Sequence, residues 1–250
     1  MAALASPSPL PTLRLPPAFQ LVVLAAGHDA FAHACRIARE SGAGTFVWVD
    51  RADVLEFAVV LEPEEPLVSA RRAVYAGMAA MADALASFAP PEKPVTFAWP
   101  AGMLFDGARL GGARLASPEG CAEVEVPDWL VFSGLLLAIP PAGQDLGAFP
   151  DATWLEAEGF PAAEHTMLIE SFARHLMVAF DSWREQGFEA VADAYLARVP
   201  KEPGADRRGI DLNGDLVHHR ESGLERRPLR PALAAAAWFD PATGLPRLRP

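Results

Sequence analysis

Cysteine is scarce in this sequence, and its scarcity excludes two common ways of stabilising a protein. The 250 residues contain two cysteines, Cys35 and Cys121, and neither belongs to a Cys-x-x-Cys motif or to a cluster of cysteine and histidine. Disulfide frameworks and structural zinc sites both need several such residues at short spacing. We therefore expect no disulfide and no bound metal.

Positive charge and long apolar runs are also limited. The chain has 21 Lys and Arg against 32 Asp and Glu, a formal net charge of −11, which disfavours broad binding to nucleic acid or anionic membranes. No uncharged apolar run reaches the roughly 18 residues of a membrane span. Residues 1–20 contain five prolines and lack the basic start and apolar core of a signal peptide. We expect a cytoplasmic protein.

The composition that remains is that of a globular protein, with 51% hydrophobic and 21% charged residues. Because domains most often contain roughly 100–150 residues, this length fits one large domain or an ordinary domain with an appendage. We divide the chain into a Pro-rich arm (1–17), a main domain (18–200) and a small C-terminal β domain (201–250).

The main domain mixes helical and strand patterns. Its clearest helix covers residues 70–88, where apolar side chains recur with a helical period. Asp29 is placed to cap another helix that ends near Ser41. Similar patterns predict strands at 20–26, 45–49, 55–61, 95–99, 123–126 and 129–139, and helices at 161–186 and 188–199. The sequence therefore predicts a mixed α/β fold.

Two turn signals predict hairpins. Asp106-Gly107 favours a tight turn between strands at 103–105 and 109–115. Asn213-Gly214 and Ser222-Gly223 separate short strands predicted at 208–211, 216–220 and 224–227, which is typical of a β-meander. A module of that size buries little surface alone, so we expect it to pack on the main domain.

The segment from Phe97 to Gly112 carries the clearest functional signal. A strand ends at Trp99, an irregular Pro-Ala-Gly turn follows, and the return strand carries Arg109 just before Gly111 and Gly112. Adjacent glycines weaken a strand and often mark the close approach of a ligand or another backbone. A guanidinium beside exposed amides suits a carboxylate or phosphate. A glycine bulge beside a solvated arginine explains the same residues.

This segment resembles the biotin/lipoate A/B protein ligase family. Those proteins carry Trp-Pro-Asn-Asp, a hairpin and Lys-x-Gly-Gly with the spacing found here between Trp99 and Gly112. Val131-Phe-Ser-Gly134 is similar to a later apolar strand of the family. Residues 187–198 resemble its closing helix, and Arg208-Gly-Ile-Asp-Leu-Asn-Gly-Asp215 resembles its C-terminal module. The matches follow the family's order over most of the chain.

The resemblance implies an α+β fold, with a mixed β-sheet flanked by helices as in class II synthetases and a small SH3-like C-terminal module. It implies ATP- and Mg2+-dependent activation of biotin or a related carboxylic acid as an acyl-adenylate, followed by transfer to a lysine of a biotinyl- or lipoyl-type carrier domain. The protein would act as a monomer or homodimer. Arg109 would take the place of the family's catalytic lysine, and the binding residues would be Gly42, Gly44, Trp48, Trp99, Gly111, Gly112 and Gly134.

Departures from the family pattern leave two hypotheses. The family's arginine-rich glycine loop is expected at residues 40–45, where Gly42 and Gly44 remain without arginines. Ala101-Gly102 replaces Asn-Asp, and a planar guanidinium at Arg109 replaces an ammonium. Charge-assisted contacts are worth about 1.5–3 kcal/mol each, so their loss weakens adenylate binding. The chain is either an active ligase or a non-catalytic protein that binds a small acyl ligand or a carrier domain.

Overall fold

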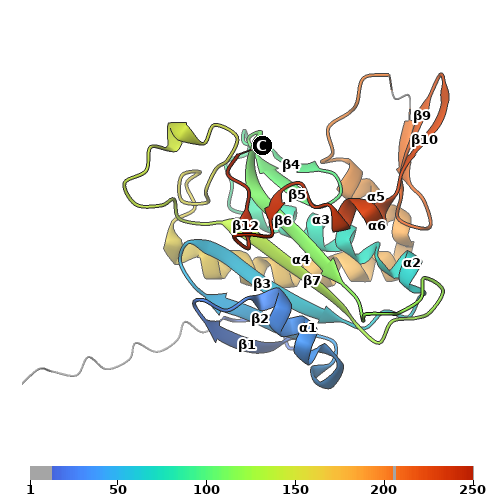
Figure 1. Cartoon of the computed structure of the whole chain (residues 1–250), viewed down its shortest axis with the longest axis horizontal. Helices are drawn as coiled ribbons and strands as arrows, with labels where there is room; N and C mark the ends of the chain where they lie inside the picture. The colour runs from blue at the N-terminus through green and yellow to red at the C-terminus, as the bar shows by residue number, and fades with distance from the viewer. Residues whose placement is uncertain (1–12, 205–206, 250) are drawn as a thin grey trace, which may run out of the picture.

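A computed structural model describes residues 13–204 and 207–249. Its centre is a seven-stranded mixed sheet in the order β1-β2-β3-β7-β6-β5-β4 (Figure 1). Only β1 and β2 run parallel. The strands are β1 Gln20–Ala25, β2 Thr45–Asp50, β3 Val54–Leu61, β4 Val95–Ala98, β5 Gly102–Phe105, β6 Ala108–Ala116 and β7 Leu130–Leu137.

Helices cover one face of this sheet, which we call the helical face. They are α3 Ala73–Ala86, α4 His165–Gln186 and α5 Phe188–Leu196, preceded by the short helix α2 Leu67–Ala70 and the 3-10 turns Leu146–Ala148 and Ala162–Glu164. Phe57 and Phe132 point from the sheet to Phe172 of α4, with ring centroids 4.4 and 5.8 Å from its ring. The predicted sheet flanked by helices is confirmed. Among the described residues, no helix is both long and apolar enough to cross a membrane.

Helix α1 (Ala30–Ser41) lies on the other face, which we call the open face. It begins as predicted, because the Oδ1 of Asp29 accepts the N–H of Ala32 at 2.8 Å. Its alanines pack on Val47, Ala58 and Val131. The neighbouring residues Phe46, Phe57 and Phe132 point to the helical face, as expected when successive side chains of a strand alternate.

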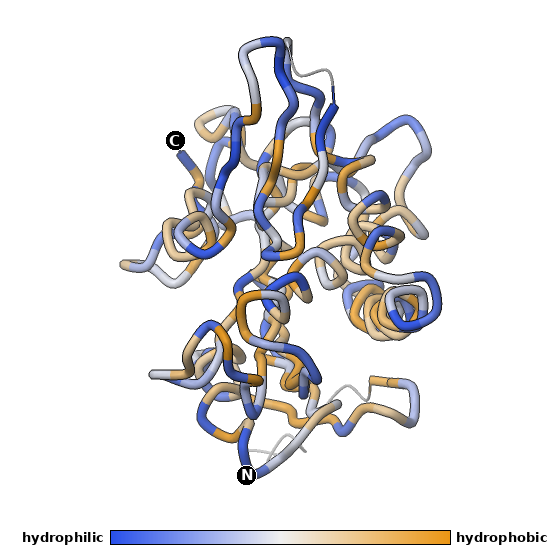
Figure 2. The backbone as a smooth tube through the Cα atoms, turned by 90° about the vertical axis from the view of Figure 1, so that its right-hand side faces the viewer, coloured by the Kyte–Doolittle hydropathy of each residue, from blue (hydrophilic) through white to orange (hydrophobic). Residues whose placement is uncertain are grey.

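Beyond residue 206 the chain forms a second, smaller sheet and then returns to the first. Strands β8 Arg207–Ile210, β9 Leu216–Arg220 and β10 Gly223–Arg227 form an antiparallel meander in the order β10-β9-β8, and hydrophilic residues predominate in it (Figure 2). The hydroxyl of Tyr75 donates to Gly214 O at 2.6 Å and fastens this sheet to α3. The meander is as predicted. Its closure into an SH3-like barrel and the domain boundary at residue 200 stay predictions.

The last part of the chain was not anticipated in this form. Helix α6 (Leu229–Ala234) is followed by the two-residue strands β11 Phe239–Asp240 and β12 Leu245–Pro246. Figure 1 shows α6 and β12 crossing the open face of the main sheet over β6 and β7. Trp238, Leu245 and Leu248 form a small core there with Leu135 and Trp154.

One predicted strand is wrong. The residues 123–126 form a turn, and the carbonyl oxygens of Glu123 and Glu125 accept the N–H groups of Val68 and Leu67 at the start of α2. These carbonyls therefore accept hydrogen bonds from the free N–H groups at the start of a helix instead of from a neighbouring strand. Pro127, next to the segment, has no N–H to donate to a neighbouring strand. The helix predicted at 70–88 is present as α3, with slightly shorter bounds, and α2 precedes it as a separate turn.

Gly77 tests whether packing outweighs helix propensity in α3. A β-carbon at Gly77 would lie 2.2 Å from the Cε2 atom of Phe132. Gly77→Ala gains about 1 kcal/mol of helix propensity, whereas overpacking of a buried ring costs about 1–3 kcal/mol. We expect a net loss of unfolding free energy, measured by urea denaturation. Gly209→Ala, where nothing lies within 4 Å of the added carbon, is the control. A more stable Gly77 variant would contradict this account.

Glu56 joins β3 to the start of α1. Its side chain is 9% exposed, and its oxygens accept the N–H of Ala30 at 2.7 Å and the Nη1 of Arg51 at 3.3 Å. Burial raises the pKa of Glu56 above its usual value, and the two donors oppose the rise without cancelling it. The folded protein therefore holds the Glu56 proton more tightly than the unfolded chain does.

This raised pKa gives a prediction with a definite sign. The contribution of Glu56 to stability falls as the pH rises from about 4.3, its unfolded pKa, through the higher folded pKa. Glu56→Gln cannot titrate, so its unfolding free energy relative to the wild type should increase from pH 4 toward neutrality. Urea titrations of both proteins at several pH values measure the difference. A difference that does not vary with pH would show that the pKa is unshifted.

Candidate ligand-binding site

The hairpin between β5 and β6 has an irregular register. Asp106 (φ 49°) and Gly107 (φ 84°) adopt the left-handed conformations of a tight turn. Gly111 pairs with Met103 and Arg109 pairs with Leu104, so Leu110 is an extra residue on β6. An extra residue reverses the alternation of side chains. Arg109 and Gly112, which a regular strand would place on opposite faces, therefore both face the open side.

The double glycine of β6 is closely packed. A β-carbon at Gly111 would lie 2.1 Å from Leu135 O. At Gly112 it would lie 2.3 Å from Ala101 O and 2.5 Å from the Cε2 atom of Trp238. Glycine is needed at both positions because other atoms occupy the space of a β-carbon. At Gly111 these are backbone atoms, and at Gly112 they are a backbone oxygen and the indole ring of Trp238. The close approach predicted at the glycines is therefore made at Gly112 by Ala101 and Trp238 of the same chain, which leave no room for a ligand there.

Arg109 binds the C-terminal part of the chain. Its Nη1 donates to Arg247 O at 2.8 Å and to Arg249 O at 3.4 Å. Its backbone N–H donates to Asp151 O at 2.8 Å, and its carbonyl accepts the N–H of Thr153 at 2.9 Å. The predicted catalytic guanidinium is thus present on the open face, in contact with main-chain carbonyls of the same protein.

Three of the other predicted residues lie on the helical face. Trp48 is 4% exposed and belongs to the main core. A β-carbon at Gly134 would lie 2.5 Å from the ring of Phe57. Trp99 donates from Nε1 to the hydroxyl of Tyr75 at 3.1 Å. The sheet therefore separates these residues from Arg109 and Gly112.

Gly42 and Gly44 lie elsewhere again, in the turn between α1 and β2. Both have positive φ, 75° and 81°, and a β-carbon at Gly44 would lie 2.2 Å from Ala18 O. Gly44 lines a cavity of about 620 Å³ that extends to Met177 and Phe180 of α4. The predicted site residues thus do not line one common pocket.

Arg114 on β6 is a site residue that the sequence analysis missed. Its guanidinium carbon lies 3.9 Å from the ring centroid of Phe31 and 4.6 Å from that of Phe239. Its side chain is 28% exposed, and its Nη1 lies 3.7 Å from the Oδ2 of Asp29. Burial lowers the pKa of Arg114, and Asp29 opposes that shift. Its position two residues after Gly112, on the same face of the strand, was the available signal.

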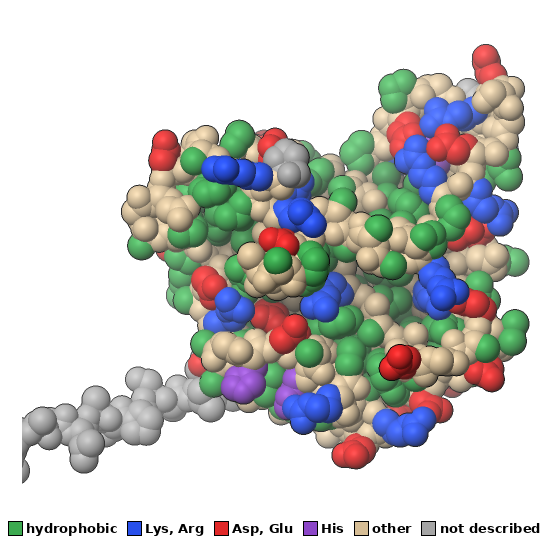
Figure 3. Space-filling view, in the orientation of Figure 1, with side chains coloured by type: hydrophobic (Ala, Val, Ile, Leu, Met, Phe, Trp, Pro, Cys, Tyr) green, Lys and Arg blue, Asp and Glu red, His purple; other side chains and the backbone are tan. Residues whose placement is uncertain are grey.

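A cavity of about 630 Å³ opens beside Arg114. Phe31, Arg114 and Leu115 form one wall, and α6 together with Phe239, Pro241 and Arg247 forms the other. Its charged lining residues are Arg114 and Arg247, and no carboxylate lines it among the described residues. Figure 3 shows basic side chains on this face near the crossing of α6 and β12 over the sheet. This cavity suits a small molecule with an apolar body and one acidic group.

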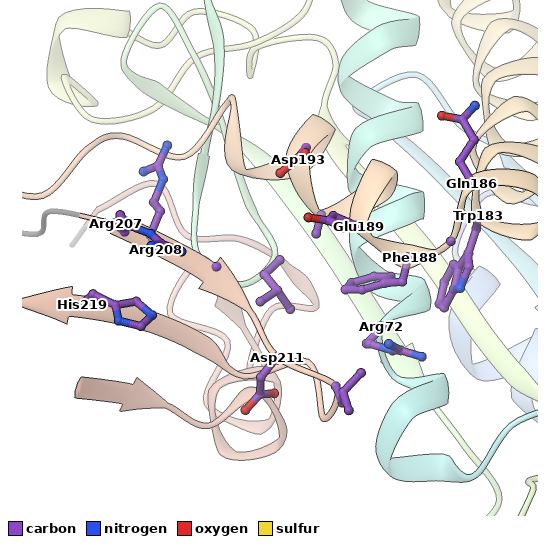
Figure 4. A pocket seen from close by; sticks show the side chains of 15 residues that line it. Arg72, Trp183, Gln186, Phe188, Glu189, Asp193, Arg207, Arg208, Asp211 and His219 are labelled. Atoms are coloured by element: carbon purple, nitrogen blue, oxygen red, sulfur yellow. The ribbon is translucent and has the colours of Figure 1, made fainter.

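A cavity of about 700 Å³ lies between the α4–α5 junction and the C-terminal sheet (Figure 4). Arg72 packs on Phe188 at 4.4 Å from its ring centroid. Glu189 and Asp193 line one wall, and Arg207 and His219 line the other. None of the predicted site residues lines this cavity. Within residues 13–204 and 207–249, no group of three or more His, Cys, Asp or Glu is arranged to hold a metal ion.

Comparison with known proteins identifies the fold. The structure is similar to a biotin protein ligase-like protein of unknown function from Silicibacter sp. TM1040, with 29% identity, a TM-score of 0.74, and 87% of this chain and 97% of that chain covered. It is also similar to biotin protein ligase from Aquifex aeolicus, as a point mutant in complex with biotin (14% identity, TM-score 0.61, 85% and 96% covered) and in complex with biotin and ATP (14%, 0.58, 82% and 94%).

No curated protein sequence matches the chain. The sequence profile of the biotin/lipoate A/B protein ligase family matches residues 15–197, well over half of the chain. The resemblance that begins at Trp99 therefore extends over the whole main sheet and its helices, and this protein belongs to the biotin/lipoate A/B protein ligase family.

Proposed function

We propose that this protein binds a small apolar carboxylic acid of the biotin or lipoate type in the cavity beside Arg114, without converting it to an adenylate. The carrying observation is the lining of that cavity, which combines two guanidinium groups with apolar side chains and main chain. A carboxylate in such a place forms charge-assisted hydrogen bonds that are stronger than those between neutral groups.

The surroundings of Arg114 prepare it for an anion. The rings of Phe31 and Phe239 both pack on its guanidinium carbon, so packing restricts the orientation of the planar group and of its N–H donors. Asp29 lies 3.7 Å away, beyond ordinary hydrogen-bond distance. A ligand carboxylate that approaches to about 2.8 Å therefore interacts more strongly with Arg114 than Asp29 does.

The apolar part of the ligand would lie along α6 and the alanines that follow it. Leu233 and residues 234–237 supply this wall. Apolar burial contributes roughly 25 cal/mol per Å² of surface removed from water, so an acyl chain or fused ring adds affinity without further polar contacts. The biotin complex of a ligase that shares this fold supports the choice of ligand class.

ATP- and Mg2+-dependent ligation to a carrier-domain lysine is the second candidate, and the hairpin that carries Arg109 and the double glycine favours it. Ligation is ranked second because of the contacts that this hairpin makes. Trp238 packs on Gly112, and Arg109 is engaged with Arg247 O and Arg249 O. With Ala101-Gly102 in place of Asn-Asp as well, few groups remain to stabilise the charge of an adenylate.

Arg114→Met tests the proposal. Biotin, lipoate and octanoate are titrated into wild-type and variant protein by calorimetry, with thermal shift as a second readout. At least one acid should bind the wild type, and the variant should lose about 10- to 100-fold in affinity, the equivalent of about 1.5–3 kcal/mol for a hydrogen bond to a charged group. Arg39→Met, at a side chain that is 75% exposed on α1, should bind as the wild type does.

Two results would overturn the proposal. One is that no acid binds the wild type, and the other is that Arg114→Met binds as tightly as Arg39→Met. Release of pyrophosphate from ATP that depends on the acid would establish the ligase instead. Acid-dependent stabilisation that is indifferent to ATP supports the binding protein.

A further inference from the structure

A groove beside α4 is lined mainly by apolar side chains. It is the cavity of about 620 Å³ that Gly44 lines, and it lies between α4 and residues 61–65 at the end of β3. Met177 on α4 is 37% exposed and lines it. The sheet and two helices supply its other apolar residues, which include Val59, Leu61, Ala73, Leu130 and Leu176. An apolar surface that is open to water at this scale is typical of a site that another molecule covers.

Helix α4 presents one side to the groove along about two turns. Leu176, Phe180 and Trp183 line it at intervals of four and three residues, which is the spacing of neighbours on one side of a helix. At a rise of 1.5 Å per residue they span roughly 10 Å. The rings of Phe180 and Trp183 are stacked, with centroids 6.1 Å apart. The groove is therefore long enough to hold about two turns of another helix.

The rim of this groove is acidic. Its charged residues are four carboxylates and one guanidinium, namely Glu62, Glu64, Glu65, Asp181 and Arg184. The guanidinium of Arg184 lies 3.1 Å from Asp181, which offsets its charge, and Glu65 is paired with Arg72 at 2.5 Å. Glu62 accepts a main-chain N–H, and neither Glu62 nor Glu64 forms an ion pair among the described residues. Two carboxylates on the rim therefore remain without a cation.

The main chain that lines the groove at Gly44 is already paired. The N–H of Gly44 donates to Val60 O at 2.9 Å, and its carbonyl accepts the N–H of Gln20 at 2.9 Å. An extended peptide on an apolar surface would bury N–H and C=O groups without partners, which is unfavourable. A helix pairs these groups internally. An amphipathic helix therefore suits the groove better than an extended peptide does.

We propose that the groove between α4 and residues 61–65 binds an amphipathic, basic helix of a partner protein. Its apolar side chains would lie along α4, and its lysine or arginine side chains would lie over Glu62 and Glu64. Apolar burial supplies the affinity, and the acidic rim selects a basic helix over an acidic one. The same rim repels an anionic membrane surface. The groove lies along α4 on the helical face and the cavity beside Arg114 lies on the open face, so each site is tested without the other.

The probe is a labelled amphipathic peptide of leucine and lysine, about 15 residues long so that it can form a helix. Its binding to the full-length protein is followed by fluorescence anisotropy. The wild type should bind it with a Kd below about 100 μM, and added salt should weaken the binding because the rim is exposed. The same peptide with glutamate in place of lysine should bind at least tenfold more weakly. Failure of the lysine peptide to bind the wild type would overturn the proposal.

Met177→Glu separates the groove from general attraction between a basic peptide and an acidic protein. The variant is more acidic than the wild type, so general attraction would strengthen binding, whereas a charge in the apolar groove should weaken it at least tenfold. Val178→Glu is the matched control, because Val178 is the next residue of α4, is 61% exposed and does not line the groove. Equal binding by the two variants would show that the peptide lies elsewhere.

Glu64→Lys tests the rim at a side chain that is exposed, so the fold should be unaffected. It should weaken binding of the lysine peptide by about five- to tenfold. Glu119→Lys, at an exposed loop residue outside the groove, changes the net charge equally and should have a smaller effect. Equal losses in the two variants would contradict the assigned rim. Binding of the wild type to phosphatidylcholine vesicles that Met177→Glu abolishes would identify a membrane as the occupant and overturn the protein partner.

Discussion

The close contact between the indole of Trp238 and the backbone of Gly112 determines the rest of the site. Only glycine leaves room for the ring there, since a β-carbon would lie 2.5 Å from the indole. With Trp238 seated, the next residue, Phe239, is carried over Arg114, and the chain turns back to bring Arg247 to Arg109. One wall of the cavity beside Arg114 therefore depends on this contact.

The parts of the fold that the sequence predicted correctly depend on local signals. Asp29 caps the helix that follows it, Asp106-Gly107 forms the expected turn, and the helix predicted at 70–88 is present as α3. Residues 123–126 look like a strand by composition, but they bond to α2. The C-terminal residues 236–249 depend on contacts such as that between Arg109 and Arg247, 138 positions apart, and no local pattern encodes such a pairing.

The site was harder to predict than the fold because a motif locates a strand without fixing its faces. Trp48 and Gly134 lie on central strands of the sheet, but both face the core between the sheet and the helices. Leu110 shifts the alternation within β6, which places Arg109, Gly112 and Arg114 on one face. A bulge depends on the partner strand as well as its own residues, so the grouping became visible only when β5 and β6 were seen paired.

The two guanidinium groups of β6 have different partners, and the difference explains where a ligand fits. Arg109 forms no salt bridge among the described residues, and its Nη1 donates to the main-chain oxygens of Arg247 and Arg249. A ligand at Arg109 would therefore have to displace main chain of the same protein. Arg114 instead lines a cavity with room for a ligand, and a carboxylate oxygen makes a shorter and roughly twofold stronger bond to guanidinium than a neutral acceptor does. The family hairpin thus keeps its shape in this protein, while the cation that suits an acidic ligand is placed further along the same strand.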